Sequence, residues 1–370
     1  MPLESDDWVL VSSVRNPWGV VPMTNGGRHL RGRAKVYMDQ LVRLQSAPDT
    51  PSRRHHYVPQ SYLRRWSFDG KRVWALDTAT GAVRPLGIAS VCVEENFHRV
   101  AGKDSVPHNR VELLFGVVDA ELNRVQTLFS QLTDPNTLEF DDLLGLGISM
   151  AVQRMRTAQQ RRLQQQHNRW LVAQDPKGFQ SIEDDQQNPH RLAGFHTSSL
   201  FETMWEAADV LTTRQIEIWE DTEGRFTTCD APVMVPFVRN VRPSLFSSQY
   251  VIWPVSPFRA IALSNDLVGE KALIRKASGK MVGTVRECVE EGRERMIFAT
   301  EDQRDRLPRG KLFRRRTQAQ LRCSDRTPLG EVIPAPGCCV EWSEALAAAP
   351  DVALCSQGLH RPAIDLVSLA

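Results

Sequence analysis

The chain has 370 residues, of which 41% are hydrophobic and 24% charged, which are ordinary values for a globular protein that buries a sizeable core. Its formal net charge is only +2, with 46 basic and 44 acidic residues, and this balance excludes a uniformly basic nucleic-acid binder. No apolar run reaches the roughly 18 residues of a membrane span, and the N-terminus is acidic where a secretory signal carries positive charge. We therefore expect a cytoplasmic protein without a membrane segment, in which the seven scattered cysteines are free thiols.

Regular hydrophobic patterning is confined to the middle of the chain. Residues 1–52 mix Gly, Pro, Arg and Ser with little periodicity, which favours a poorly ordered N-terminal extension. Residues 301–370 are first rich in arginine and then in alanine and proline, a composition typical of a tail of low order. The sequence thus predicts one core domain over 53–300 between two flexible extensions.

The first half of this core predicts a hairpin followed by helices. The segments "KRVWALD" and "AVRPL" flank "TATG" and read as two short antiparallel strands. Apolar residues then recur every three or four positions over 109–132, which predicts a long helix, and a second helix is expected from roughly 139 to 170. Ser199 and Glu202 have the spacing of a capping box and are expected to open a third helix.

The second half of the core predicts mostly strands. "RQIEIWE" and "RFTTCD" flank the turn "DTEG" and predict a hairpin, and "YVIWPVSPFRAIALS" predicts two more strands around a bend. A short helix in "GTVRECVEEGRERM" and a closing strand in "MIFAT" complete the core. Because helices and strands do not alternate regularly, we expect an α+β fold, as a mainly helical single domain with short β-hairpins.

The stretch "RRHHYVPQSYLRRW", residues 53–66, contains two adjacent histidines. Pro59 holds the preceding residue in extended geometry and is itself a favoured first residue of a helix, so an extended segment is expected to turn into a short helix there. Side chains of an extended segment alternate between faces, so His55 and His56 are expected to point in opposite directions. One of them can then face a site as a metal ligand or general base, whereas the alternative is a tandem of surface or hydrogen-bonded histidines.

The segments "HHYVPQSYLRRW", "GKRVWALD" and "VCVEENFH" together resemble the bacterial domain-of-unknown-function (DUF) 4238 family. "AVQRMRTAQQRR", "FTTCDAPV" and "WPVSPFRAIAL" follow in the order in which that family has its further motifs, so the resemblance covers about 53–300. The chain departs from the pattern at Ala158, Cys229 and His98, where the family tends to have Pro, Ser or Asn, and Tyr. The resemblance implies membership of a family without an assigned activity.

The polar residues that match this resemblance are the candidate site residues: His55, His56, Glu94, Glu95, Gln153, Arg156, Arg161 and Asp230. His and Asp are ligands for a divalent metal that activates water, and His56 and Asp230 are the expected metal ligands. Arg156 or Arg161 is expected to hold a phosphate through a bidentate contact. Cys229 beside Asp230 is a nucleophile in principle, but nothing marks it as activated.

Two functions of different classes remain open at this stage. The first is a metal-dependent hydrolase, of the phosphodiesterase or nuclease kind, whose partner is nucleic acid or another phosphate-containing ligand. No recognised catalytic spacing supports it. The second is a non-catalytic binding module, in which the His-His-Tyr motif is structural and the Arg-rich stretch 304–316 binds nucleic acid or an acidic partner. Exposed acidic pairs, solvated helix faces and an Asx turn at Asp230 are the non-functional interpretations of the same residues.

Overall fold

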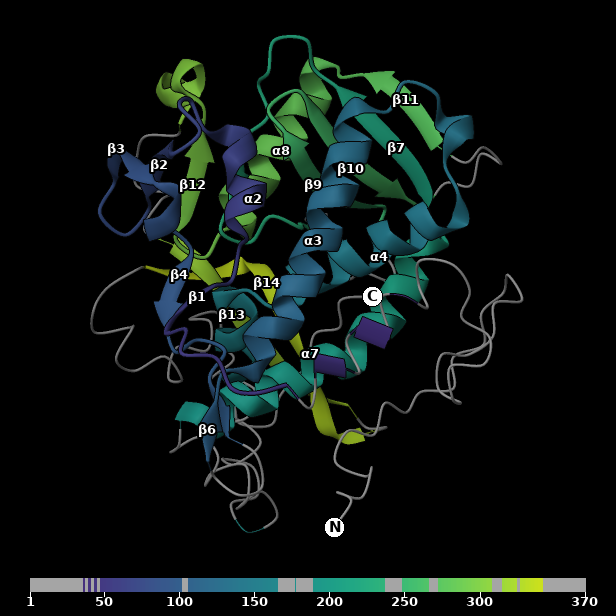
Figure 1. Cartoon of the computed structure of the whole chain (residues 1–370). Helices are drawn as coiled ribbons and strands as arrows, with labels where there is room; N and C mark the ends of the chain where they lie inside the picture. Colours follow the sequence, from purple (N-terminus) through teal and green to yellow (C-terminus); the bar gives the residue numbers. More distant parts are fainter. Residues whose placement is uncertain are drawn as a thin grey trace.

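The structure is a computed structural model, and it describes residues 47–101, 106–165, 189–236, 248–265 and 272–307, the strands 315–324 and 327–341, and isolated positions at 36, 39–40, 43–44 and 177. Two four-stranded and three two-stranded sheets lie among the helices of this described part (Figure 1). The fold is therefore α+β, but the expectation of a mainly helical domain is wrong. It is wrong because short strands far apart in the sequence assemble into sheets that local patterning does not reveal.

The first of the two four-stranded sheets has the strand order β11-β7-β10-β9. Its members are β7 (Gln215–Glu220), β9 (Tyr250–Ser256), β10 (Arg259–Ser264) and β11 (Ala272–Lys276). The two strands predicted around a bend are confirmed as β9 and β10, which pair antiparallel with each other, and β11 adds to β7 in parallel. Strands β9 and β10 are buried almost throughout, which explains why their sequences are nearly continuous apolar runs.

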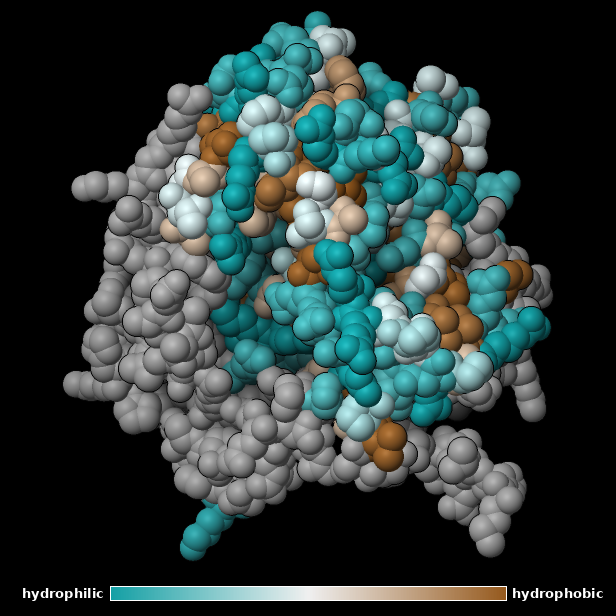
Figure 2. Space-filling view, turned by 60° about the vertical axis from the view of Figure 1, so that its left-hand side comes forward, coloured by the Kyte–Doolittle hydropathy of each residue, from teal (hydrophilic) through white to brown (hydrophobic). Residues whose placement is uncertain are grey.

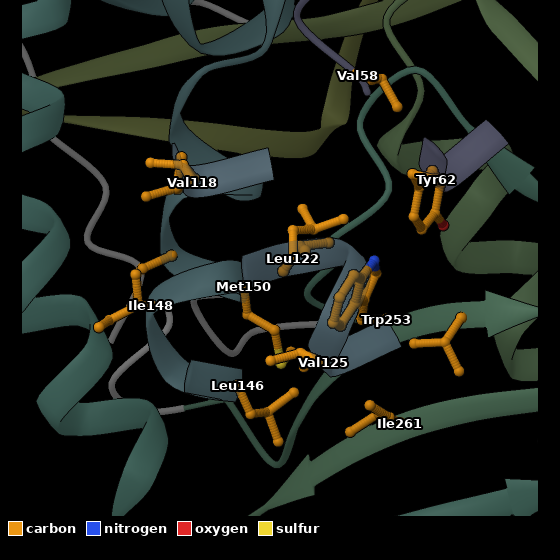
Figure 3. Close-up of a cluster of buried hydrophobic side chains, with 14 of the residues drawn as sticks. Val58, Tyr62, Val118, Leu122, Val125, Leu146, Ile148, Met150, Trp253 and Ile261 are labelled. Carbon is orange, nitrogen blue, oxygen red and sulfur yellow. The ribbon is translucent and has the colours of Figure 1, made fainter. Parts of the chain in front are cut away.

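Alternate residues of that sheet enter two different cores. Trp253 and Ile261 pack with residues of the helices α3 (Arg110–Gln131) and α4 (Phe140–Met155). Ile252 and Ala260 pack with the helix α8 (Gly279–Gly292). In Figure 3, Leu122 and Val125 of α3 lie beside Met150 of α4 and Trp253 of β9, and all four are fully buried. The period of two along each strand thus places the sheet between two helical layers.

The second four-stranded sheet has the order β3-β2-β12-β8. It contains β2 (Arg72–Asp77), β3 (Ala82–Gly87), β8 (Thr228–Cys229) and β12 (Met296–Ala299), and every pairing is antiparallel. The predicted hairpin of β2 and β3 is confirmed. The predicted hairpin of "RQIEIWE" with "RFTTCD" is wrong, because β7 and β8 belong to different sheets.

Three long helices lie in the described part of the chain: α3 (Arg110–Gln131), α4 (Phe140–Met155) and α7 (Pro189–Thr212). The helix predicted over 109–132 is confirmed by α3. The helix predicted over 139–170 is interrupted, since the chain turns at residues 156–157 before helix resumes over 158–165. Helix α7 begins ten residues before Ser199, so the capping box expected at that serine does not open a helix.

The opening stretch has the expected shape. Strand β1 (Arg54–His56) leads into Pro59, which caps α2 (Gln60–Leu63), and the 3-10 turn η2 (Arg64–Trp66) follows. Strand β1 pairs antiparallel with β4 (Val93–Glu95). The buried hydroxyl of Tyr62 donates a hydrogen bond to the Pro254 carbonyl at 2.6 Å, so this stretch is anchored directly to strand β9.

Ordered structure continues past the predicted core boundary at residue 300. The 3-10 helix η5 (Glu301–Arg306) packs on the core, because its buried Gln303 donates a hydrogen bond to the Phe226 carbonyl at 2.8 Å. The strands β13 (Arg315–Ser324) and β14 (Thr327–Glu341) form an antiparallel hairpin within the predicted tail. Most of the predicted extension over 1–52 and most of the Arg-rich stretch 304–316 lie outside the residues whose side chains are described, whereas residues 47–52 are described.

Figure 2 shows one face of the molecule, and the part of it that is coloured is mostly hydrophilic, with apolar spots scattered among the hydrophilic residues. None of the helices in the described part combines the length and the apolar character that a membrane span requires.

Candidate functional site

The pairing of β1 with β4 positions His55. This histidine lies opposite Glu94 in the register, and its ring is completely buried. The His98 backbone N–H donates a hydrogen bond to Nδ1 of His55 at 2.8 Å, and Nε2 lies 3.2 Å from the Ser52 carbonyl. Because Nδ1 accepts, Nε2 carries the proton and donates to Ser52, so the His55 ring is neutral in this arrangement.

His56 contacts a different part of the protein. Its pKa is lowered by burial and by the charge of Arg54, while backbone hydrogen bonds at Ala89 and Ile88 act in the opposite direction. Its Nε2 is buried without a hydrogen-bond partner in the described part of the chain. The two adjacent histidines therefore have separate environments, as the alternation along an extended strand requires.

The carboxylate of Glu112 brings two histidines together at the first turn of α3. Its Oε1 lies 2.5 Å from Nδ1 of His98 and 3.8 Å from Nδ1 of His55. The two imidazole rings stack nearly parallel, with 5.7 Å between centroids and 7° between planes. One possible ligand atom from each of these three residues lies within 4.8 Å of the others, so we call His55, His98 and Glu112 the His–Glu cluster.

Burial shifts the pKa values of Glu112 and His98, the two residues in the 2.5 Å contact, in opposite directions. It raises the pKa of Glu112 to about 7, an effect that the charge of Arg156 opposes. It lowers the pKa of His98 well below the ordinary value, and the charges of Arg161 and Arg156 lower it further. His98 is therefore neutral at neutral pH, and when its N–H faces Glu112 its Nε2 keeps a lone pair. That Nε2 is buried and has no partner among the described residues.

Arg156 joins the His-His-Tyr segment to the end of α4. Its guanidinium is fully buried, with Nη1 2.6 Å from Oδ1 of Asp119, and its Nη2 donates a hydrogen bond to Oε1 of Gln153 at 2.9 Å. The amide of Gln153 donates in turn to the Tyr57 carbonyl at 3.3 Å. Arg156 and Gln153 thus form a polar network that already includes a carboxylate.

Arg161 has a different environment. It lies on the helical segment that follows the turn at 156–157, and its guanidinium carbon is 3.4 Å from the centroid of the Phe97 ring. Its Nε and Nη2 are 3.4 Å from Nδ1 of His196, a buried histidine whose Nε2 donates to the Met155 carbonyl. Burial lowers the pKa of Arg161 to about 9, although the charge of Glu94 opposes this. No carboxylate among the described residues is within ion-pair distance of it.

The remaining predicted residues are placed elsewhere. Glu94 and Glu95 are exposed on β4. The buried carboxylate of Asp230 accepts backbone N–H groups from Glu294, Arg295 and Met296, each at 2.8 Å, so it fastens β8 to the start of β12. Cys229 is buried, its thiol donates to the Ala231 carbonyl, and burial raises its pKa, which disfavours the thiolate.

The structure thus brings together only part of the set predicted from the sequence. His55, Arg156 and Arg161 converge around His98 and Glu112, whereas His56, Glu95 and Asp230 do not belong to the His–Glu cluster. In the sequence, His98 stands out only as a departure from a family pattern, and nothing in the motifs singles out Glu112. The available signal for Glu112 was a carboxylate in the first turn of an apolar helix, between the buried residues Val111 and Phe115.

Fold and site together define an α+β protein with a buried histidine–carboxylate cluster beside arginine side chains. A family model described as "Protein of unknown function (DUF4238)" matches residues 54–302, and the chain belongs to this family. No curated protein and no solved structure matches the chain. The activity must therefore be argued from the site.

Proposed function

We propose that this protein is a hydrolase that uses a divalent cation held by His55, His98 and Glu112. The observation that carries this proposal is the approach of three ligand atoms to within 4.8 Å of one another. Two imidazoles and one carboxylate form a ligand set typical of catalytic zinc, which keeps a further position for water. A cation in that position lowers the pKa of its water and so supplies a hydroxide at neutral pH.

The cation would take the place of the proton between His98 and Glu112. Two ligands at about 2.0–2.1 Å from a tetrahedral zinc are roughly 3.3 Å apart. Nδ1 of His98 and Oε1 of Glu112, which are 2.5 Å apart, must therefore separate slightly on binding. The side chain of Glu112 is 21% exposed, in contrast to the buried histidines, so it is the member of the cluster with the freedom to move.

A second candidate function is a binding module in which the His-His-Tyr motif only supports the fold. The observation that favours it is the hydrogen bonding of His55, because both of its ring nitrogens already have backbone partners. In that case His98 and Glu112 form a buried hydrogen-bonded pair and no metal binds.

Metal binding by the full chain distinguishes these two functions. We expect the purified protein, stripped with a chelator, to bind one equivalent of Zn²⁺ or Mn²⁺ in calorimetry. The substitutions H98A and E112Q are expected to abolish binding. H56A is the matched control, because His56 is the neighbouring histidine outside the cluster, and it is expected to bind like the parent.

Each other outcome has a definite meaning. Loss of metal by H56A with retention by H98A would instead identify His56 as a ligand, one of the two ligands expected from the sequence. If the parent binds no metal, the non-catalytic binding module is the function that remains. Hydrolysis is then tested with bis(p-nitrophenyl) phosphate as a generic phosphodiester, and the activity should disappear with chelator and in E112Q.

A further inference from the structure

We propose that Arg161 is the anchor for a phosphate group of the substrate, and that Phe97 and His196 hold its guanidinium in place for that purpose. This inference rests on the proposed function in one respect, since it names the substrate class of the same site. It depends on different residues from those that would hold the cation. It is supported by the placement of Arg161, by the absence of an ion pair to its guanidinium among the described residues, and by the unpartnered nitrogens near it.

The placement of Arg161 follows from two features of the chain. The turn at residues 156–157 redirects the helix, so the segment 158–165 lies against the residues that follow β4. The guanidinium lies on the face of Phe97, and the same ring packs edge-on against His98, with 4.9 Å between their centroids. A single aromatic ring thus separates Arg161 from the His–Glu cluster.

The neighbouring arginines show what Arg161 lacks. Arg162 is held by both oxygens of Glu294, at 2.6 and 2.7 Å, and Arg156 is paired with Asp119 at 2.6 Å. Among the described residues, Arg161 makes hydrogen bonds only to His196. Burial lowers the pKa of His196 to about 3, so this histidine is a neutral acceptor. Burial lowers the pKa of Arg161, and the charge of Glu94 opposes this without forming an ion pair among the described residues. An anionic ligand in contact with the guanidinium would offset the cost of burying that cation.

Two buried nitrogens close to this site are also without partners in the described part of the chain. They are Nε2 of His98, on a side chain that is 1% exposed, and Nε of Arg99. The charges of both Arg161 and Arg99 lower the pKa of His55, so both arginines contribute positive charge near the His–Glu cluster.

The geometry of the guanidinium favours phosphate as that anion. Nε and Nη2 are directed to His196, and Nη1 makes no hydrogen bond with the described residues. A planar fork of donors matches two oxygens of a phosphate, and such charge-assisted contacts are the strong ones. A phosphate held by Arg161 next to a cation in the His–Glu cluster is the arrangement that phosphoester hydrolysis needs.

The test measures phosphate binding separately from metal binding. Inorganic phosphate is titrated into the chelator-stripped full chain and its variants. We expect R161Q to weaken phosphate binding by about ten- to a hundredfold, the equivalent of one lost charge-assisted contact. R161K, which keeps the charge but not the fork, should fall between R161Q and the parent. R286Q changes an exposed arginine of α8 and should bind phosphate like the parent.

The outcomes separate this inference from the proposed function. Zn²⁺ binding without phosphate should be the same in R161Q and in the parent. If the parent binds Zn²⁺ but no phosphate at millimolar concentration, or if R161Q binds phosphate as the parent does, the anchor is wrong and the metal site stands. If phosphate binds through Arg161 but no metal binds, the hydrolase is wrong and the anion site stands. If R161Q does not fold, phosphate binding by R161K is compared with that of the parent instead.

Discussion

At the scale of single residues, the most unusual backbone conformations lie at the two ends of β4. Cys92 and Asn96 have φ of 51° and 55°, in the left-handed region that residues other than glycine seldom adopt. The Cys92 carbonyl accepts a hydrogen bond from Tyr57, and the Asn96 N–H donates one to Arg53. These bonds clamp β4 against β1, and the bend at Asn96 lets the next residues return so that the His98 N–H reaches His55. Strain of about 1–2 kcal/mol at such a residue persists only where its surroundings fix it.

Asp230 is the residue for which structure and sequence suggest different roles. Its two oxygens accept three backbone N–H groups, so D230N replaces one acceptor by an NH₂ group that faces these donors. We expect D230N to lower the free energy of unfolding in urea by about 2–4 kcal/mol, the cost of leaving one or two buried donors unpaired. Zn²⁺ binding by the folded fraction should not change.

The control for Asp230 is D302N, which alters an exposed aspartate of η5 and should leave the unfolding free energy within about 0.5 kcal/mol of the parent. If D230N instead keeps the parent's stability but loses Zn²⁺, Asp230 is a metal ligand, as we predicted from the sequence.

At the scale of the elements, α4 and α7 approach each other closely at Gly147. A Cβ atom on Gly147 would lie 2.9 Å from the backbone carbonyl oxygen of Ala208 and 2.9 Å from a methyl group of Thr212. Contacts this short to backbone cannot be relieved by a side-chain rotation. Gly147 therefore lets the two helices approach, which keeps His196 of α7 close to the end of α4.

The contrast between two helical glycines tests this packing. Alanine is about 1 kcal/mol better than glycine inside a helix. We expect G116A, on an exposed face of α3 with nothing within 4 Å of the new Cβ, to raise the unfolding free energy by roughly that amount. G147A should lower it by about 1–3 kcal/mol, because overpacking outweighs propensity. A stabilising G147A in urea unfolding would show that the helices can separate without cost.

The elements also show what the sequence could and could not predict. Periodicity identified α3 and the hairpins β2–β3 and β9–β10 because these patterns are local. The turn after β7 looked like a hairpin turn, yet Asp221 binds Arg225 through its side chain and the chain leaves for another sheet. A partner strand such as β12, far along the chain, cannot be identified from alternation alone.

The Asp221–Arg225 turn carries a prediction about pH. Burial by itself raises the pKa of Asp221, but hydrogen bonds from the Arg225 side chain and backbone lower it more, so the net pKa lies below the ordinary value. A depressed pKa contributes stability above the unfolded-state value of about 3.9, and this contribution is lost as the pH falls through that value and below it. In urea unfolding, the stability advantage of the parent over D221N should therefore shrink as the pH falls from 6 toward 3. A stability advantage of the parent over D221N that does not change with pH would contradict this prediction.

At the scale of the whole molecule, the site is assembled from five separate segments. His55 comes from β1, His98 from the chain after β4, Glu112 from α3, Arg161 from the helix after the turn, and His196 from α7. The sequence could suggest His55 and Arg161 because they stand in recognisable motifs. It could not predict that Glu112 rather than Glu94 meets the histidines, because that depends on how α3 is rotated against β1 and β4.

Because the ligands of the proposed cation come from β1, the segment after β4 and α3, the cation should stabilise the whole fold. A ligand that binds only the folded chain raises the unfolding free energy by about 2.7 kcal/mol at a hundred times its Kd. For a domain of this size, that corresponds to a rise in Tm of roughly 5–10 °C. We expect Zn²⁺ to produce this rise in calorimetric melting of the parent and of H56A, and a chelator to reverse it.

The same melting experiment on H98A and E112Q decides where that stabilisation comes from. Both variants should melt at a temperature that does not depend on Zn²⁺, even if their metal-free Tm differs from that of the parent. The comparison is made within each variant, so a general loss of stability cannot imitate a lost ligand. An equal rise in Tm in H98A and E112Q would mean that the cation binds elsewhere, for example at exposed side chains, and the His–Glu cluster would then be only a buried hydrogen-bonded pair.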